Sequence, residues 1–399
     1  MRVAARIDSD ARAITVFEYF PDNYAWSLSV VWAIEASGTF SEIHDAIQSL
    51  RPAAKQDSAQ GGMAWYSAWH GLAAQRLKTA RQAEQKGFIQ SAGRSYYRAG
   101  IYQLMAVRFL PRTDSRGNAA YVDGTKYFLR GIELLGKPGR ALNVPYDDGK
   151  LPAILAMPIS NGAAPCVIVF GGFDSLKEWL YPILVDAFMA RGIALLVVDQ
   201  AGVGGALRLY NVPAVPEAER SAKACVDALE RIPGIDSRRI GLAGISLGGY
   251  YAPRAAAYEP RIRACCAWGG AFSPAKLFSR LVNEPDKARS IPDMIEHARW
   301  VFGAADREQT LQVAQRLSLA PIIDQIRCPL LVLHGADDRQ VNDDDAENTV
   351  RLAINSERAE LKVFTVEQGG AEHCQLDNAA LAADYMADWF AEELCRDAG

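Results

Sequence analysis

The 399-residue sequence has no run of about 18 consecutive apolar residues, which is the shortest segment expected to span a membrane. Its first twenty residues are interrupted by Asp8, Asp10 and Arg12, so they lack the continuous apolar core of a secretion signal. These two absences predict a cytoplasmic protein with no membrane partner.

Cysteine is scarce and is not arranged in a metal-binding or disulfide pattern. The seven cysteines are an odd number and are scattered, and no C-x-x-C pair or H-E-x-x-H motif is present. Cys166, Cys265 and Cys266 lie in apolar runs that are typical of buried strands. We therefore expect reduced, structural thiols and neither a metal site nor another cofactor.

The sequence also lacks an excess of positive charge. Lys and Arg number 43 against 47 Asp and Glu, which gives a net charge of -4. No basic field is available to hold nucleic acid or an anionic membrane. Half of the residues are apolar and 23% are charged, as in ordinary globular proteins. A small-molecule substrate is the better expectation.

Residues 1–140 contain long helical patterns. The segment 63–86 spaces Trp65, Trp69 and Leu72 as a helix would, and Gly87 is a plausible terminator. A second helical segment, 88–110, is closed by Pro111, and its aromatic residues are interpreted as packing core. We expect this range to form an all-helical N-terminal cap domain.

Residues 141–399 have a different pattern, which begins after a turn-rich stretch at 137–152. Short apolar runs alternate with segments of helical length, as in a parallel sheet buried on both faces. The expected strands are 166–170, 193–199, 239–246, 264–270, 330–335 and 361–366. This range is therefore predicted to be an α/β catalytic domain with a mostly parallel, doubly wound sheet. The mostly helical stretch 272–327 is longer than one crossover requires, so it is a possible contribution to a lid.

Gly244, Ser246 and Gly248 form a G-x-S-x-G motif between a strand-like run and a helix-like run. That context is typical of the nucleophile turn of α/β-hydrolases, where the strained serine needs small neighbours. A serine hydroxyl is a weak nucleophile and requires a base. The hydrolase chain order then predicts Asp338 as the acid and His373 as the base.

Other residues could in principle take the acid and base positions. Asp337 is the rival to Asp338, and we favour Asp338, which lies in the turn that leaves the strand. His44 and His70 lie on expected N-terminal helices, and His334 ends a buried strand, where it is expected to fix the turn. The remaining histidine besides His373 is His297, which lies in the lid-like stretch and could contact substrate.

Acyl transfer also requires donors for an oxyanion. The backbone N–H of Leu247, next to the nucleophile, is one expected donor. The other is expected from the loop after strand 166–170, with Phe173 as first choice and Gly172 as the alternative. The glycine-rich cluster 202–205 does not satisfy G-x-G-x-x-G, so it and the preceding Asp199 are interpreted as structural.

Five segments together resemble one branch of the α/β-hydrolases that carries a helical N-terminal domain. They are 91–103, 143–158, 170–179, 244–256 and 370–375. The branch includes dihydroxypseudooxynicotine hydrolase, fungal chain-shortening hydrolases of polyketides and fermentation-respiration-switch esterases. The resemblance implies a homodimer, no cofactor, an active site between cap and sheet, and the same three residues in the triad. It also implies hydrolysis of a C–C bond in a β-diketone-like compound of secondary metabolism.

The sequence therefore predicts a serine hydrolase that forms an acyl-enzyme on Ser246 from an aromatic or polyketide-type ketone. A carboxylesterase or thioesterase, or a cyclase that transfers the acyl group to an internal nucleophile, would use the same triad. A non-catalytic binding module on the same scaffold is the alternative from another class, and the complete triad argues against it.

Overall fold

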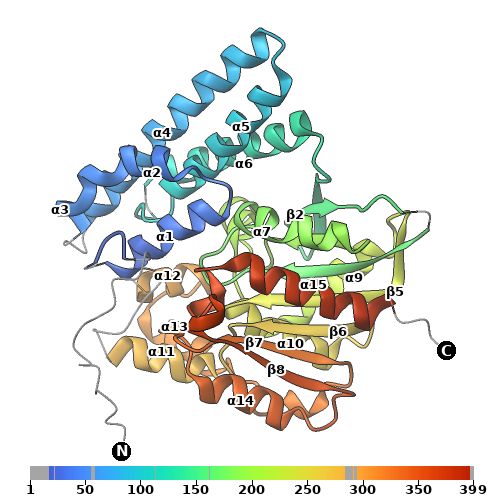
Figure 1. The fold of residues 1–399 in the computed structure, drawn as a ribbon. Helices are drawn as coiled ribbons and strands as arrows, with labels where there is room; N and C mark the ends of the chain where they lie inside the picture. Colours follow the sequence, from blue (N-terminus) through green and yellow to red (C-terminus); the bar gives the residue numbers. More distant parts are fainter. Residues whose placement is uncertain are drawn as a thin grey trace, which may run out of the picture.

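The structure is a computed structural model that describes residues 18–21, 23–54, 59–112, 114–160, 162–283, 291 and 294–395. Helices precede the first strand: α1 (Tyr24–Glu35), α2 (Phe40–Ile47), the 3-10 turn η1 (Gln48–Leu50), α3 (Arg51–Ala54), α4 (Ala59–Gln85), α5 (Ile89–Ala106) and α6 (Arg116–Leu135). They form a layer of their own beside the sheet and its flanking helices (Figure 1). In the described ranges, no helix is long and apolar enough to cross a bilayer.

The strands within the described ranges form one eight-stranded sheet in the order β1-β2-β4-β3-β5-β6-β7-β8. Their bounds are β1 (Arg140–Tyr146), β2 (Gly149–Ala156), β3 (Ala164–Phe170), β4 (Ala194–Val198), β5 (Ile235–Ile245), β6 (Ile262–Trp268), β7 (Leu330–Gly335) and β8 (Ala359–Phe364). From β4 to β8 in this order all neighbours run parallel. The mostly parallel α/β sheet expected from the apolar runs is confirmed.

The interpretation of 137–152 as a turn-rich stretch is wrong for most of its length. Strands β1 and β2 form an antiparallel hairpin, and β2 also pairs with β4 in antiparallel orientation. The turn is confined to Asp147 and Asp148, and Asp147 has a left-handed φ of 43°. Pro145 lies on the edge strand β1, where a missing N–H is tolerated, so its presence did not exclude a strand.

Alternation along each strand assigns side chains to the two faces of the sheet. On β3, Val167 and Val169 join the apolar cluster that contains Leu180 of α7 and Phe390 of α15. Ile168 and Phe170 join the other cluster, with Val226 and Tyr250 of the opposite helices. The helices of this part are α7 (Lys177–Ala190), α8 (Gly204–Tyr210), α9 (Glu219–Leu229), α10 (Leu247–Tyr258), α11 (Pro274–Asn283), α12 (Met294–Val301), α13 (Arg307–Gln315), α14 (Asp343–Leu352) and α15 (Ala379–Cys395), with 3-10 turns η2 (Ile323–Gln325), η3 (Val366–Gln368) and η4 (His373–Gln375).

Candidate active site

Ser246 occupies the turn between β5 and α10, and its backbone has φ 56° and ψ -118°. This conformation is strained for a residue with a side chain. The flanking glycines make the turn possible. A Cβ on Gly244 would lie 2.0 Å from the Gly248 carbonyl oxygen, and one on Gly248 would lie 2.6 Å from the Gly171 carbonyl oxygen. The motif therefore places the Ser246 hydroxyl at the carboxyl edge of the sheet.

The structure brings Ser246, His373 and Asp338 into one hydrogen-bonded chain. The Nε2 atom of His373 lies 3.0 Å from the Ser246 hydroxyl, and its Nδ1 atom lies 2.7 Å from Oδ2 of Asp338. The other Asp338 oxygen accepts hydrogen bonds from the backbone N–H groups of Gln340 and Val341 at 2.8 and 2.9 Å. With Nδ1–H donating to Asp338, Nε2 is free to accept the serine proton.

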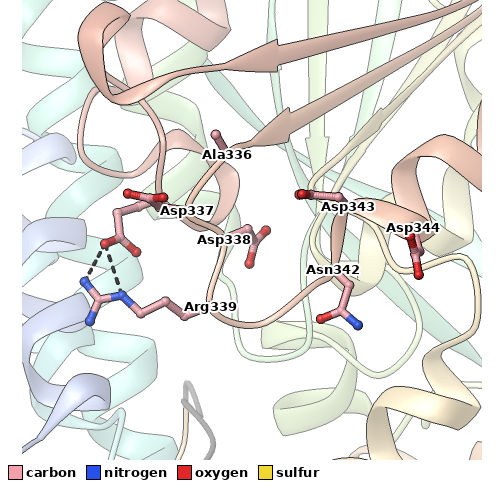
Figure 2. Close-up of a pocket in the computed structure, with 8 residues that line it drawn as sticks. Ala336, Asp337, Asp338, Arg339, Asn342, Asp343 and Asp344 are labelled. Carbon is pink, nitrogen blue, oxygen red and sulfur yellow. Dashed lines mark hydrogen bonds and ion pairs between the residues drawn. The ribbon is translucent and has the colours of Figure 1, made fainter. Parts of the chain in front are cut away.

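Asp338 takes its position from the loop that follows β7 (Figure 2). Its side chain is fully buried, whereas the neighbouring Asp337 is exposed. The backbone N–H of Asp337 instead donates to the Ala371 carbonyl at 2.9 Å, which links the acid loop to the loop that carries His373. Asp338 rather than Asp337 therefore contacts His373.

Burial and charge act in opposite directions on the His373–Asp338 pair. Burial disfavours the imidazolium, but the Asp338 carboxylate outweighs burial and holds the pKa of His373 well above its ordinary value of 6.5. Burial by itself would raise the pKa of Asp338, yet the His373 ring and its hydrogen bonds keep that pKa below its usual value. The pair is therefore arranged to stabilise a cation on the imidazole.

A carboxylate that sequence reasoning missed holds the His373 loop. Asp377 accepts hydrogen bonds from the backbone N–H groups of Gly370, Ala371 and Glu372 at 2.9, 2.9 and 3.1 Å. Three donors on one carboxylate fix the backbone immediately before His373. The only sequence signal was an aspartate four residues after the histidine.

The remaining histidines have other partners. His44 and His70 bond to side chains of the N-terminal part, through Nδ1 in both cases. His334 lies 3.0 Å from a carboxylate oxygen of Asp343 at the start of α14, which agrees with the expected turn-fixing position. His297 contacts the loop after β3.

The loop after β3 presents one of the two backbone N–H groups expected to bind an oxyanion. The Gly172 N–H donates to the Ser175 hydroxyl at 2.9 Å, so this alternative donor is already engaged. Among the described residues, neither the Phe173 N–H nor the Leu247 N–H has an intramolecular acceptor. A Cβ on Gly172 would lie 2.9 Å from the Ser246 Cβ, which shows how closely the loop approaches the serine.

Gln200 fixes this loop, and it was not predicted from the sequence. Its side-chain amide donates to the Gly171 carbonyl at 2.8 Å and its oxygen accepts from the Gly171 N–H at 2.9 Å. His297 holds the other end, because its Nε2 lies 3.1 Å from the Phe173 carbonyl. Both contacts restrict the orientation of the Phe173 peptide.

Three arginine side chains that were not predicted from the sequence lie close together beside Phe173. We call the hollow that they line the arginine cavity, and its walls include Arg108, Arg112, Phe173, Arg208, His297 and Trp300. Arg112 donates to Nδ1 of His297 at 2.6 Å, and Arg108 pairs with Asp174 at 2.6 Å. The available signal was the presence of two arginines in the otherwise apolar stretch 104–112.

Asp199 is structural, as expected, and it belongs to a buried network between the N-terminal helices and the sheet. Lys177 Nζ lies 2.9 Å from Asp199, 2.6 Å from Glu178 and 3.1 Å from the Tyr121 hydroxyl. The Tyr121 hydroxyl donates to Asp199 at 2.9 Å, and the Thr125 hydroxyl donates to Glu178 at 2.9 Å. Two residues of α6 thus donate hydrogen bonds to buried carboxylates at the start of α7 and directly after β4.

A mostly parallel sheet with a serine in a strained strand-to-helix turn defines an α/β-hydrolase. The family described as "Esterase FrsA-like" matches residues 58–348, and the chain belongs to this family of hydrolases. The alternative of a non-catalytic binding module is therefore dropped.

Two curated relatives match most of the chain. It is 29% identical over 333 residues to 2,6-dihydropseudooxynicotine hydrolase of Paenarthrobacter nicotinovorans, which covers 83% of this chain and 84% of the relative. It is 28% identical over 363 residues to 20-hydroxy-prefusarin hydrolase FUS2 of Gibberella moniliformis, covering 82% and 86%. The solved structure of 2,6-dihydroxy-pseudo-oxynicotine hydrolase has a TM-score of 0.74 at 24% identity, covering 91% and 95% of the two chains, and shows the shared fold.

Proposed function

We propose that this hydrolase acts by acyl-enzyme chemistry, with Ser246 as nucleophile, His373 as general base and Asp338 as the orienting acid. The observation that carries the proposal is the continuous hydrogen-bonded chain from the serine hydroxyl to the buried carboxylate. Because all three groups are held by backbone turns and loops anchored to the sheet, little rearrangement is needed before reaction.

In the first step the Ser246 oxygen forms a bond to the substrate carbonyl carbon while its proton moves to Nε2 of His373. The carbonyl electrons move to oxygen, and the oxyanion accepts hydrogen bonds from the N–H groups of Phe173 and Leu247. Asp338 stabilises the imidazolium formed in this step, which is consistent with the raised pKa of His373.

We propose hydrolysis of a C–C bond in a β-diketone-like aromatic or polyketide-type substrate. Collapse of the tetrahedral intermediate breaks the bond between the attacked carbonyl carbon and its neighbour, and the electron pair leaves as an enolate. The enolate takes its proton from the His373 imidazolium. Water, deprotonated by His373, then attacks the acyl-enzyme and releases a carboxylic acid, which restores Ser246.

A carboxylesterase or thioesterase is the second candidate, favoured by the description of the family as FrsA-like esterases. The triad and oxyanion donors would be unchanged, and only the leaving group would differ. Transfer of the acyl group to a nucleophile within the substrate, giving a cyclic product, is the related variant.

We further propose that helices α1–α6 act as a cap over the site. Three contacts support this role, because they reach elements that carry the proposed machinery. Tyr24 at the start of α1 accepts a hydrogen bond from Gln340 in the acid loop, at 3.3 Å. Arg108 in the segment after α5 binds Asp174, and Arg112 binds His297.

The test is to compare the wild type with Ser246→Ala on a short-chain nitrophenyl ester and on an aryl β-diketone. Faster turnover of the diketone, lost in Ser246→Ala but kept in the exposed-serine control Ser91→Ala, would support C–C hydrolysis. Ester turnover with an inert diketone would favour the esterase. Absence of fluorophosphonate labelling at Ser246 would exclude the acyl-enzyme in both cases.

A further inference from the structure

The arginine cavity shares one wall with the proposed oxyanion site. Phe173 contributes its backbone N–H to that site, while its ring and carbonyl face α12 and the segments around it. The ring lies 4.6 Å from the His297 ring and 5.4 Å from the Phe278 ring, centroid to centroid. The cavity and the proposed oxyanion site therefore share Phe173 as a common residue.

Two of the cavity's arginines have no carboxylate partner among the described residues. Arg112 donates to His297, and within the described ranges the Arg208 guanidinium lies over the Tyr121 and Trp300 rings. Both guanidinium groups lie over the Trp300 ring, with their central carbons 4.5 and 4.9 Å from the ring centroid. Each side chain keeps part of its surface accessible, as contact with a ligand requires.

The nearby carboxylates are already engaged. Asp174 is paired with Arg108 at 2.6 Å. Asp199 accepts hydrogen bonds from the Lys177 ammonium, the Tyr121 hydroxyl and the backbone N–H groups of Lys177 and Gly205. Lys177 in turn is paired with Glu178 and Asp199. Among the described residues, these carboxylates are therefore occupied by cations other than Arg112 and Arg208.

The electrostatics of Arg112 and Arg208 favour the binding of an anion. Burial lowers the pKa of Arg112, and the neighbouring Arg208 lowers it further. Burial also places the pKa of Arg208 below its ordinary value. A partly buried cation without a counter-ion is costly, and a bound oxyanion would reduce that cost. Trp179 lines the same cavity, and its indole N–H, which has no hydrogen-bond partner among the described residues, offers a further donor.

We propose that Arg112 and Arg208 bind a carboxylate of the substrate, so that this hydrolase acts on acyl compounds that carry an acid group a few bonds from the reacting carbonyl. The inference rests on the proposed function for its position relative to Ser246. It adds a substrate class: oxo acids for C–C cleavage, or half-esters of dicarboxylic acids for ester cleavage. Guanidinium groups suit this task because their planar N–H donors match a carboxylate.

The kinetic test uses two activated esters that differ only in charge at the distal end, 4-nitrophenyl butyrate and mono-4-nitrophenyl glutarate. We expect the wild type to have the higher kcat/KM for the glutarate. In Arg112→Met and Arg208→Met the ratio of the two kcat/KM values should fall about tenfold, the size of one charged hydrogen bond. The exposed-arginine control Arg238→Met should keep the wild-type ratio.

A binding test separates this inference from the catalytic one. Glutarate should bind to Ser246→Ala, measured by calorimetry, and should bind at least about tenfold more weakly to Ser246→Ala combined with Arg112→Met. If neither ester is hydrolysed but glutarate binds in this arginine-dependent way, the catalytic proposal fails and the carboxylate site stands. If the neutral ester is hydrolysed and glutarate binding ignores the arginines, the carboxylate site is overturned and the catalytic proposal stands. Preference for inorganic phosphate over glutarate would also overturn the carboxylate assignment.

Discussion

The triad and the arginine cavity differ in how their charged groups are paired within the protein. In the triad, the Asp338 carboxylate faces the His373 imidazole and two backbone N–H groups, so each acceptor has a donor within the protein. In the cavity, Arg112 and Arg208 have no carboxylate partner among the described residues. The Asp338 carboxylate is thus fully paired within the protein, whereas the two guanidinium groups are not paired with a carboxylate of the described residues.

This difference corresponds to two tasks of an enzyme, which are catalysis and substrate recognition. Groups that perform the reaction must be preorganised before substrate arrives, so the protein supplies all their partners. Groups that recognise substrate gain affinity when a ligand supplies the missing partner. The comparison therefore predicts that changes in the triad reduce the rate with every substrate, whereas changes in the cavity alter the choice among substrates.

The largest effect should come from Ser246→Ala, which removes the nucleophile and leaves both arginines in place. We expect turnover of any substrate to fall by about 10⁴-fold or more, while glutarate binding measured by calorimetry is retained. Loss of both activity and binding would contradict the separation of the two sites.

Asp338→Asn should come next, with a loss of kcat of about 10³-fold to 10⁴-fold because the imidazole loses its orienting carboxylate.

The direction in which wild-type activity changes with pH follows from the pKa of His373. His373 must be neutral to accept the serine proton, and its pKa is raised, so wild-type activity should increase with pH through a midpoint above 6.5.

Removing the Asp338 charge should move that midpoint to lower pH, because the carboxylate is what favours the imidazolium. The measurement is kcat/KM for 4-nitrophenyl butyrate across the pH range, with Asp337→Asn as the matched control. An unchanged midpoint in Asp338→Asn would refute the assigned cause of the pKa shift.

Gly172→Ala should have an intermediate effect on the rate. The added Cβ would lie 2.9 Å from the Ser246 Cβ and 3.0 Å from the Ser175 hydroxyl, so the loop that carries the Phe173 N–H must shift. Loss of one oxyanion donor corresponds to about 10²-fold in kcat. Gly162→Ala, where an added Cβ meets no atom within 4 Å, is the control and should keep wild-type activity.

The smallest effect is expected from Arg208→Lys, which keeps the charge but loses the planar donor pair. The kcat/KM ratio between the glutarate and butyrate esters should fall by only about threefold, about half of a charged hydrogen bond in free energy. A loss as large as that in Arg208→Met would mean that geometry rather than charge governs recognition.

The two sites also differ in how far sequence could predict them. Ser246 is marked by its flanking glycines, because the strained turn requires small neighbours. Asp338 and His373 were selected by the chain order of α/β-hydrolases together with their positions after expected strands. The six parallel strands were similarly evident from apolar runs. The β1–β2 hairpin was missed, since its prolines, aspartates and glycines are also turn residues and only pairing with β4 distinguishes the two interpretations.

The arginine cavity could not be predicted in the same way. Arg112 follows α5 whereas Arg208 belongs to α8, and the Trp300 ring that both contact lies in α12. No local spacing connects these three segments, so only tertiary packing brings them together. The homodimer and the cytoplasmic location implied at the level of sequence stay predictions.

The Lys177 network has a further consequence, for how the polypeptide unfolds. Lys177, Glu178 and Asp199 are almost fully buried, and α6 supplies two of their hydrogen-bond donors through Tyr121 and Thr125. Removal of one partner from a buried charged group typically costs about 3–5 kcal/mol. A truncated chain that begins at residue 141 would lose both donors at once. The helical layer and the sheet should therefore melt in a single cooperative transition, and neither should persist as a stable fragment.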